Sequence, residues 1–376
     1  MKDKVAFVGF YESNQISPVS QDIVDLNKHF QRRESLFRSL GLLPSFIAGK
    51  SILEFGPGSG HNALYMASLK PERYELVDGN PKGVQETRGR LAAYSDSQVE
   101  VHQSLFEEFQ TDAQFDLVWA EGCLPHQSEP LPLLDHISLF VARGGGYVVS
   151  TANGISYLSE TLRRLFRDRF FTASGDVHQQ AQQLKPYMAP HLQYLRGMSR
   201  PVEDWILDNI VQPLQYRKLL SIPDVIASLD KRFDVYGSSP CFLTDWRWYK
   251  DIVGENRGFN NRALESYYTS NLNLLDYRFE FSPHSQEFGK KLEELGSQSW
   301  DMMCRIEKGE ESVWQELFLL LQELCAHVEK SAPETSEAIR EAMTLLQSGH
   351  PDMELNHFPQ WWGRGQQYLS LIRKDN

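Results

Sequence analysis

The spacing of apolar and polar residues divides the chain into an alternating first part and a helical remainder. Between residues 50 and 153, short apolar runs alternate with stretches whose apolar residues recur at helical intervals. The runs predict strands at KSILEFG (50–56), RYELVDGN (73–80), QVEVHQSLF (98–106), FDLVWAEG (115–122) and GYVVSTAN (146–153). The stretches between them predict helices at 61–70, 80–94 and 129–145, and another helix over 23–40 precedes the first strand.

Strands that alternate with helices at this interval indicate a parallel sheet with helices on both faces. The predicted fold class is therefore α/β, a doubly wound and mostly parallel sheet with a largely helical insertion and a helical C-terminal region. The expected divisions are an N-terminal helical segment (1–44), the α/β domain (45–153), a helical insertion or lid (154–220), the end of the α/β domain with an aromatic segment (221–280) and a helical C-terminal region (281–376).

Composition and charge narrow the class of protein. The formal net charge of -12 argues against a general nucleic-acid or anionic-membrane binder, which needs clustered cations. The four cysteines form no CxxC pair, so we expect reduced thiols and no metal site. No apolar run reaches the roughly 18 residues of a membrane span, and the N-terminal stretch is not a secretory signal. These features predict a cytoplasmic protein.

The stretch LEFGPGSG carries the first candidate chemistry. Three glycines at alternate positions, Gly56, Gly58 and Gly60, directly follow an apolar strand. Bare backbone between a strand and a helix lets a ligand approach closely. A dinucleotide site would have GxGxxG, but His61 stands where its third glycine belongs. Glu54 at the strand end would repel a pyrophosphate and suits a cationic ligand.

These residues resemble motif I of the class I S-adenosylmethionine-dependent methyltransferases, an acid followed by GxGxG. ELVDG places Asp78 where that family holds the ribose hydroxyls, and QSLF falls where it contacts adenine. FDLVWAEG and ARGGGYVVS match its fourth and fifth strands, so the resemblance covers about residues 45–152. It implies S-adenosyl-L-methionine as the cofactor, bound by Glu54, Gly56, Pro57, Gly58, Asn62, Asp78, Gly79, Ser104, Leu105 and Glu121. The acid that often accepts the adenine amino group is absent, so Ser104 or a backbone group must replace it.

Candidates for catalysis and acceptor binding lie further along the chain. His126 follows the fourth strand and could act as a general base; alternatively it could be a loop histidine, or one that packs under the cofactor. Glu121 could contact cofactor or acceptor, or belong to a solvated turn. Asp245, Arg247 and Trp248, in DWRWYK, could bind the acceptor, or form core aromatic packing around an internal ion pair. The basic run Arg163, Arg164, Arg167 and Arg169 could face an anionic acceptor or be a solvated helix face.

The predicted function is methyl transfer to a small-molecule or carbohydrate-like acceptor, with oxygen as the attacking atom. An N-methyltransferase of a small amine and a non-catalytic cofactor-binding module remain alternatives, whereas the glycine spacing disfavours a nicotinamide oxidoreductase. The NPPY-type motif of many nucleobase N-methyltransferases does not follow the fourth strand, so we expect no nucleic-acid partner. A homo-oligomer formed through the C-terminal helices is left open, and QWWGRGQQYLSLIRK is expected to be a docked tail.

Overall fold

The computed structural model describes residues 9–10, 14, 23–94, 98–125, 127–171, 175–198, 200–214 and 218–374. The chain forms two compact units, each built from several stretches of sequence. The first unit contains residues 1–151, 217–266 and 366–376, and the second contains residues 152–216 and 267–365. The sequence predicts divisions after residues 44, 153, 220 and 280. The chain passes from the first unit to the second after residue 151 and returns to the first after residue 216, near the second and third of these predicted divisions. The functional division of the chain stays a prediction.

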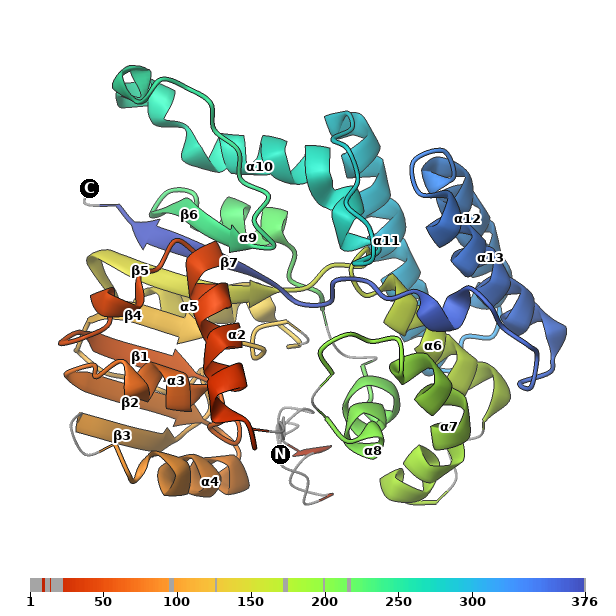
Figure 1. Cartoon of the computed structure of the whole chain (residues 1–376), viewed down its shortest axis with the longest axis horizontal. Coiled ribbons are helices and arrows are strands. Elements are labelled where there is room, and N and C mark those ends of the chain that lie inside the picture. The colour runs from red at the N-terminus through yellow and green to blue at the C-terminus, as the bar shows by residue number, and fades with distance from the viewer. Residues whose placement is uncertain are drawn as a thin grey trace. The chain divides into compact units, whose positions relative to one another are not determined.

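A seven-stranded sheet organises the first unit (Figure 1). Its strands are β1 (Ser51–Phe55), β2 (Arg73–Asp78), β3 (Gln98–Gln103), β4 (Phe115–Ala120), β5 (Val141–Thr151), β6 (Phe233–Ser239) and β7 (Gln367–Arg373). Their order is β3-β2-β1-β4-β5-β7-β6, and β7 is antiparallel to both of its neighbours while the other pairs are parallel. The predicted doubly wound, mostly parallel fold class is confirmed.

The central strands carry buried residues on both of their faces, because helices cover both sides of the sheet. Ile52, Leu76 and Trp119 belong to the core that includes residues of α2 (Leu26–Ser39), α3 (Ala63–Ser68) and α4 (Pro81–Leu91). Tyr147 on β5 faces the other way, and its hydroxyl donates to the carbonyl of Leu134 in α5 (Pro130–Ser138). The remaining elements of this unit are η1 (Pro44–Phe46), α9 (Ile222–Leu229), η3 (Tyr249–Asp251), η4 (Gly254–Arg257) and the start of α10 (Phe259–Ser270).

Two stretches differ from the sequence-based prediction. The helix predicted over 129–145 ends at Ser138, and β5 begins at Val141, because buried Val141 pairs with Phe115 in the sheet. The last part of the C-terminal stretch was predicted to be a docked tail, but residues 367–373 form the strand β7, which lies between β5 and β6. Buried Leu369 and Leu371 alternate with residues of the opposite face, the periodicity of a strand.

The second unit is helical, as predicted. Its elements are α6 (Leu158–Phe170), α7 (Val177–Leu192), α8 (Val202–Ile206), the π-helical turn η2 (Leu207–Val211), η5 (Asn271–Leu274), α11 (Gln286–Glu307), α12 (Val313–Val328), α13 (Pro333–Ser348) and η6 (Phe358–Gln360). Among the described residues, none of the helices in either unit combines the length and apolar character that a bilayer crossing needs.

Two members of the basic run on α6, Arg163 and Arg164, lie in the core of this unit rather than on a solvated face, whereas Arg169 is exposed. Arg163 is fully buried, donates to the carbonyls of Ser159 and Trp361 at 2.9 and 3.0 Å, and lies 3.6 Å from the Trp362 ring centroid. Burial lowers the pKa of Arg163 to about 9, so the guanidinium stays charged at neutral pH. The neighbouring Arg164 donates to the carboxylate of Glu307 at 2.8 Å.

Substituting Glu307 tests this buried ion pair. Its carboxylate accepts from Arg164, from Arg167 at 2.9 Å and from the backbone N–H of Leu214 at 3.1 Å. Glu307→Gln leaves the buried guanidinium of Arg164 without its counter-charge, while Arg167 keeps its pair with Asp168. We therefore expect the free energy of unfolding to fall by about 3 kcal/mol or more. Glu310→Gln, which weakens an exposed pair with Arg305, should cost less than about 1 kcal/mol. Equal losses for the two variants in urea denaturation would contradict the assignment.

Candidate functional site

The residues predicted to hold the cofactor gather at the carboxyl ends of β1, β2 and β4, which are neighbours in the sheet (Figure 1). Parallel strands end at the same edge, and ligands of open α/β sheets bind outside that edge. Glu54 precedes the end of β1, Asp78 ends β2 and Glu121 directly follows β4. The order of the strands therefore brings together three acids that are far apart in the sequence.

Asp78 ties the turn after β1 to the end of β2. One carboxylate oxygen accepts the backbone N–H of Gly58 at 2.9 Å, and the other accepts that of Asn80 at 2.8 Å. Asn80 in turn caps α4, because its side-chain oxygen accepts the N–H groups of Lys82 and Gly83. Burial raises the pKa of Asp78 to about 6, although both backbone hydrogen bonds oppose that shift.

The glycine turn is bare because neighbouring groups leave no room for side chains. A Cβ atom on Gly56 would lie 2.6 Å from the Cβ of Cys123, and the residue has a φ of +71°. A Cβ atom on Gly60 would lie 2.8 Å from the hydroxyl oxygen of Thr87, which donates to the carbonyl of Gly58 at 3.0 Å. Substitutions at these two glycines would be strained. The turn and α4 therefore pack backbone against backbone, beside the Asp78 carboxylate.

Glu54 is the second acid at this edge and is buried under the turn. Its carboxylate accepts the hydroxyl of Tyr74 on β2. Burial, together with the nearby charges of Glu121 and Asp78, raises the pKa of Glu54 to about 7, although the hydrogen bond from Tyr74 opposes the shift. Among the described residues, no cationic side chain is bonded to this buried carboxyl group, so a positively charged ligand group would stabilise its ionised form.

Glu121 lies in a network that the sequence did not reveal. Its carboxylate forms a bidentate pair with Arg33 of α2, at 2.8 and 2.7 Å, and also accepts from Asn62, from the indole N–H of Trp119 and from the hydroxyl of Tyr368. The side chain is only 11% exposed, so the solvated-turn alternative is wrong. These donors hold the pKa of Glu121 below its usual value despite burial. Its contact with a cofactor stays a prediction.

The end of β3 lies beside Asp78, as the adenine prediction requires. Gln103 pairs with Asp78 across the two strands, and the N–H of Ser104 donates to the carbonyl of Asp78 at 3.1 Å. The hydroxyl of Ser104 donates to the carbonyl of Leu105 at 2.9 Å. Ser104 and Leu105 thus belong to the same edge as the glycine turn, while Pro57 and Gly79 occupy the two turns that Asp78 joins.

Two other predictions are not found in this group among the described residues. His126 lies outside the described residues. Asp245, Arg247 and Trp248 lie in the segment that follows the end of β6 at Ser239, and this segment contacts residues beside the start of β6. Arg247 donates to the carbonyl of Arg257, whose side chain pairs with Asp234 at 3.9 Å. The internal pair of Asp245 with Arg247 is confirmed, but core packing is wrong, because Trp248 is exposed. The structure does not bring these residues to the cofactor edge.

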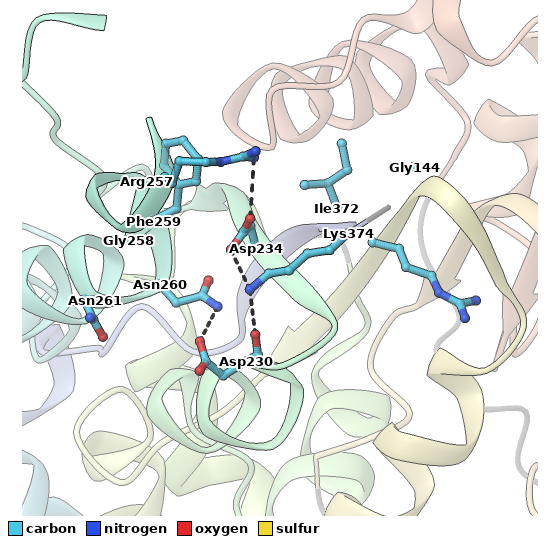
Figure 2. Close-up of a pocket in the computed structure, with 12 residues that line it drawn as sticks. Gly144, Asp230, Asp234, Arg257, Gly258, Phe259, Asn260, Asn261, Ile372 and Lys374 are labelled. Atoms are coloured by element: carbon cyan, nitrogen blue, oxygen red, sulfur yellow. Dashed lines mark hydrogen bonds and ion pairs between the residues drawn. The ribbon is translucent and has the colours of Figure 1, made fainter. Parts of the chain in front are cut away.

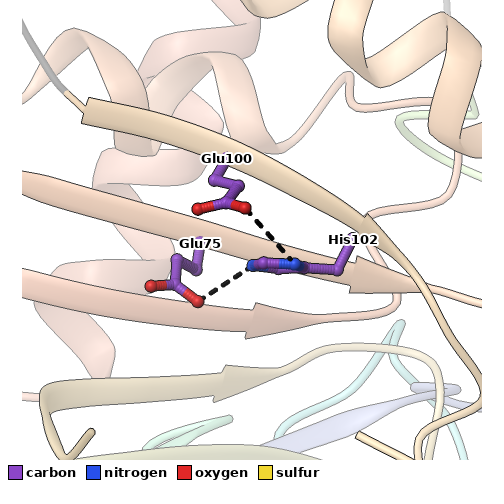
Figure 3. Close-up of side chains that lie close together, drawn as sticks. All are labelled: Glu75, Glu100 and His102. Atoms are coloured by element: carbon purple, nitrogen blue, oxygen red, sulfur yellow. Dashed lines mark hydrogen bonds and ion pairs between the residues drawn. The ribbon is translucent and has the colours of Figure 1, made fainter. Parts of the chain in front are cut away.

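A group of metal-binding residue types lies on β2 and β3 (Figure 3). Nε2 of His102 lies 2.9 Å from a carboxylate oxygen of Glu75, and Nδ1 lies 3.7 Å from Glu100. Glu75 is buried and also pairs with Arg73. The cation Arg73 already balances the buried charge, so the group is explained as an ion-pair network between neighbouring strands.

Residues 28–199 match the family model described as a methyltransferase domain. This segment, a little under half of the chain, is a methyltransferase domain, and the resemblance predicted from the glycine turn and Asp78 is confirmed over it. Such a domain implies S-adenosyl-L-methionine as the methyl donor, also as predicted. No curated protein matches the chain.

Several solved structures are similar to the chain. The CcbJ methyltransferase from Streptomyces caelestis is 21% identical, with a TM-score of 0.28, over 33% of this chain and 50% of that one, so the chain spans half of its length. The N-methyltransferase NodS from Bradyrhizobium japonicum WM9, in complex with S-adenosyl-L-homocysteine, is 21% identical over 39% and 74%, with a TM-score of 0.33. YjhP from E. coli is 11% identical over 98% and 99%, with a TM-score of 0.37.

The raised pKa of Glu54 predicts how stability depends on pH. The unfolded carboxyl loses its proton near pH 4.5 and the folded one near 7, so the free energy of unfolding of the ligand-free protein falls across this window as pH rises. Glu54→Gln keeps an acceptor for Tyr74 and removes the ionisation. By about pH 8 we expect it to be roughly 3 kcal/mol more stable than the parent, at about 1.4 kcal/mol per pH unit.

Urea denaturation between pH 4.5 and 8 measures this difference. The exposed Glu107→Gln serves as the control and should follow the parent at every pH. Parallel profiles for the parent and Glu54→Gln would show that Glu54 ionises normally in the folded chain.

Proposed function

We propose that the protein is an S-adenosylmethionine-dependent methyltransferase that acts on a small-molecule or carbohydrate-like acceptor and transfers the methyl group to oxygen. The observation that carries the proposal is the bond between the Asp78 carboxylate and the N–H of Gly58, which joins the bare turn to the end of β2. The methyltransferase-domain match over residues 28–199 supports it.

The donor set fits this cofactor. Each Asp78 oxygen has one backbone donor, and a carboxylate has about four lone-pair sites, so both oxygens keep capacity for ribose hydroxyls. Glu54 would balance the positive charge of the amino-acid end. Gly56 and Gly58 would let the backbone approach it, with Ser104 and Leu105 on the adenine side. Pro57, Asn62, Gly79 and Glu121 complete the proposed set.

Bound at this edge, the cofactor would supply a methyl group activated by a sulfonium centre. The chain then has to hold the acceptor oxygen in line with that methyl group, and positioning of this kind is worth several kcal/mol. His126, which follows β4 in the sequence, is proposed to accept the hydroxyl proton as the oxygen attacks. The sequence EGCLPHQ lacks the NPPY-type motif of many amide and nucleobase N-methyltransferases, which disfavours those acceptors and leaves a small amine as the alternative to oxygen.

Turnover tests the proposal directly. Purified protein with methyl-labelled S-adenosylmethionine and a small-molecule extract should release S-adenosylhomocysteine and give a product one methyl group heavier. Acid and base stability of the new bond, followed by fragmentation in a mass spectrometer, separates an ether or ester from a methylated amine. Cofactor binding without any product from such extracts would favour the non-catalytic alternative.

Asp78→Asn should weaken cofactor binding by at least about tenfold, because each charge-assisted hydrogen bond is worth roughly 1.5–3 kcal/mol. Calorimetric titration with S-adenosylhomocysteine measures the change. Asp116→Asn is a matched control: Asp116 accepts the N–H of Ser51 at 2.9 Å, but at the amino end of β1. The control should bind as the parent does. Unchanged affinity of Asp78→Asn would reduce Asp78 to a structural bond of the turn.

His126→Ala should lower kcat by at least about tenfold while cofactor affinity barely changes, because a general base typically contributes about 10²- to 10⁴-fold. Steady-state kinetics with the acceptor identified by turnover measures kcat, and His350→Ala, at an exposed position of the second unit, is the control. A loss of cofactor affinity would instead place His126 beside the cofactor, and no change in either quantity would remove it from the mechanism.

A further inference from the structure

Two of the cavities among the described residues differ in what their linings leave for a ligand. The first, of about 490 Å³, belongs to the first unit, and its charged side chains are bonded to one another: Asp234 pairs with Lys374 and with Arg257, as Figure 2 shows. The second, of about 350 Å³, is lined by residues of α6, α7, α13 and the segment 351–359, all of which belong to the second unit. Its volume is within the range of small-ligand sites.

Apolar side chains form most of the lining of the second cavity. Its buried apolar members include Phe166, Met188, Leu345 and Phe358. Among the described residues of this lining, Asp352 carries the only formal charge, and it is exposed. A negatively charged ligand would therefore meet an acid and no cation in this wall. The lining favours a neutral and mostly apolar molecule.

One polar group in this wall, the imidazole of His191, has its proton fixed by a neighbour. Nε of Arg163 donates to Nδ1 of His191 at 3.1 Å, and because a guanidinium has no acceptor, Nδ1 is the ring nitrogen without a proton. Burial and the charge of Arg163 lower the pKa of His191 to about 2, so the neutral ring carries its proton on Nε2. The ring also packs at right angles to that of Phe358, with centroids 5.2 Å apart, which fixes its orientation.

The Nε2–H group of His191 is left without an acceptor. The other polar atoms of the residue have partners: Nδ1 is bonded to Arg163, and the backbone carbonyl accepts the indole N–H of Trp362 at 3.3 Å. No described residue accepts from Nε2, although His191 is only 6% exposed and lines the cavity. A buried donor without an acceptor is unfavourable, so a ligand oxygen bonded to Nε2 would be stabilising. An ammonium group, which has donors alone, would not supply this bond.

We propose that this cavity binds a neutral, mostly apolar molecule through one hydrogen bond, from Nε2 of His191 to an acceptor oxygen such as a ketone or ester carbonyl. The apolar wall supplies most of the affinity, and His191 selects molecules that carry the acceptor. Every residue of the site belongs to the second unit, so the proposal does not rest on the proposed function.

Titration with indanone tests the proposal, and indane, which has the same ring system without the carbonyl, is the matched probe. In protein with isotope-labelled methionine methyl groups, indanone should shift the NMR signals of Met188 and Met353, which line the cavity. The signal of Met302, on α11 and outside this lining, should stay in place. Binding that shifts neither Met188 nor Met353 would refute the site, as would an absence of binding.

His191→Asn tests the donor. The shorter amide can place its oxygen near the position of Nδ1, which keeps an acceptor for Arg163, and it removes the donor at Nε2. The ratio of indanone affinity to indane affinity should fall by at least about fivefold, because comparing the two probes cancels their shared apolar contacts. A ratio equal to that of the parent would overturn the assignment of His191.

Met353→Trp tests the location with the donor intact. Met353 is half-buried, so a larger side chain fills the cavity from its rim and should weaken binding of both probes by at least about tenfold. Met302→Trp, at a half-buried position outside the lining, is the control and should bind like the parent. Equal weakening by the two tryptophan variants would contradict the proposed location.

S-adenosylhomocysteine binding, measured by calorimetry on the same samples, keeps this result separate from the proposed function. Its affinity should be the same in the parent and in all three variants, and saturating amounts should not displace indanone. Displacement would show that indanone occupies the cofactor site, which would refute the second site.

Discussion

The candidate site depends on one hydrogen bond, from the backbone N–H of Gly58 to the carboxylate of Asp78. β1 and β2 are neighbours in the sheet, and this bond joins the turns that follow them. Through Asn80, the same carboxylate is linked to the N-cap of α4. The turn is thereby shaped before any ligand binds, which reduces the ordering cost that a ligand would otherwise meet.

A second constraint is the burial of two carboxyl groups within one small region. Glu121 is stabilised as an anion by Arg33 and several neutral donors, whereas Glu54 has the hydroxyl of Tyr74 and a raised pKa of about 7. One acid is thus fully compensated by the protein and the other is not. Glu121 fixes α2 and β7 to the end of β4 through its bonds to Arg33 and Tyr368. Glu54 is the carboxyl group whose negative charge a cationic ligand would balance.

How much the sequence predicts depends on how far apart the interacting residues are. The strands, the glycine turn and the cap at Asn80 have local patterns, so they and the fold class could be predicted. Arg33 and Tyr368 meet Glu121 from helix and strand segments 88 and 247 residues away, and no local pattern marks such contacts. Charge misled the interpretation of Arg163, since carbonyls and the Trp362 ring compensate its burial. The DWRWYK composition suggested binding, but only the contacts of Arg247 with Arg257, and of Arg257 with Asp234, show that the segment lies beside the start of β6.

The central claim is that the turn joined by Asp78 binds S-adenosylmethionine. Calorimetric titration of the purified parent protein with S-adenosylmethionine, and with S-adenosylhomocysteine, tests this most directly. The account predicts one site per chain with micromolar-range affinity for both, and proton release on binding of S-adenosylmethionine near pH 6.5, seen as a dependence of the measured heat on the buffer, because the bound cation favours ionised Glu54. No binding heat and no rise in melting temperature with either compound would contradict it.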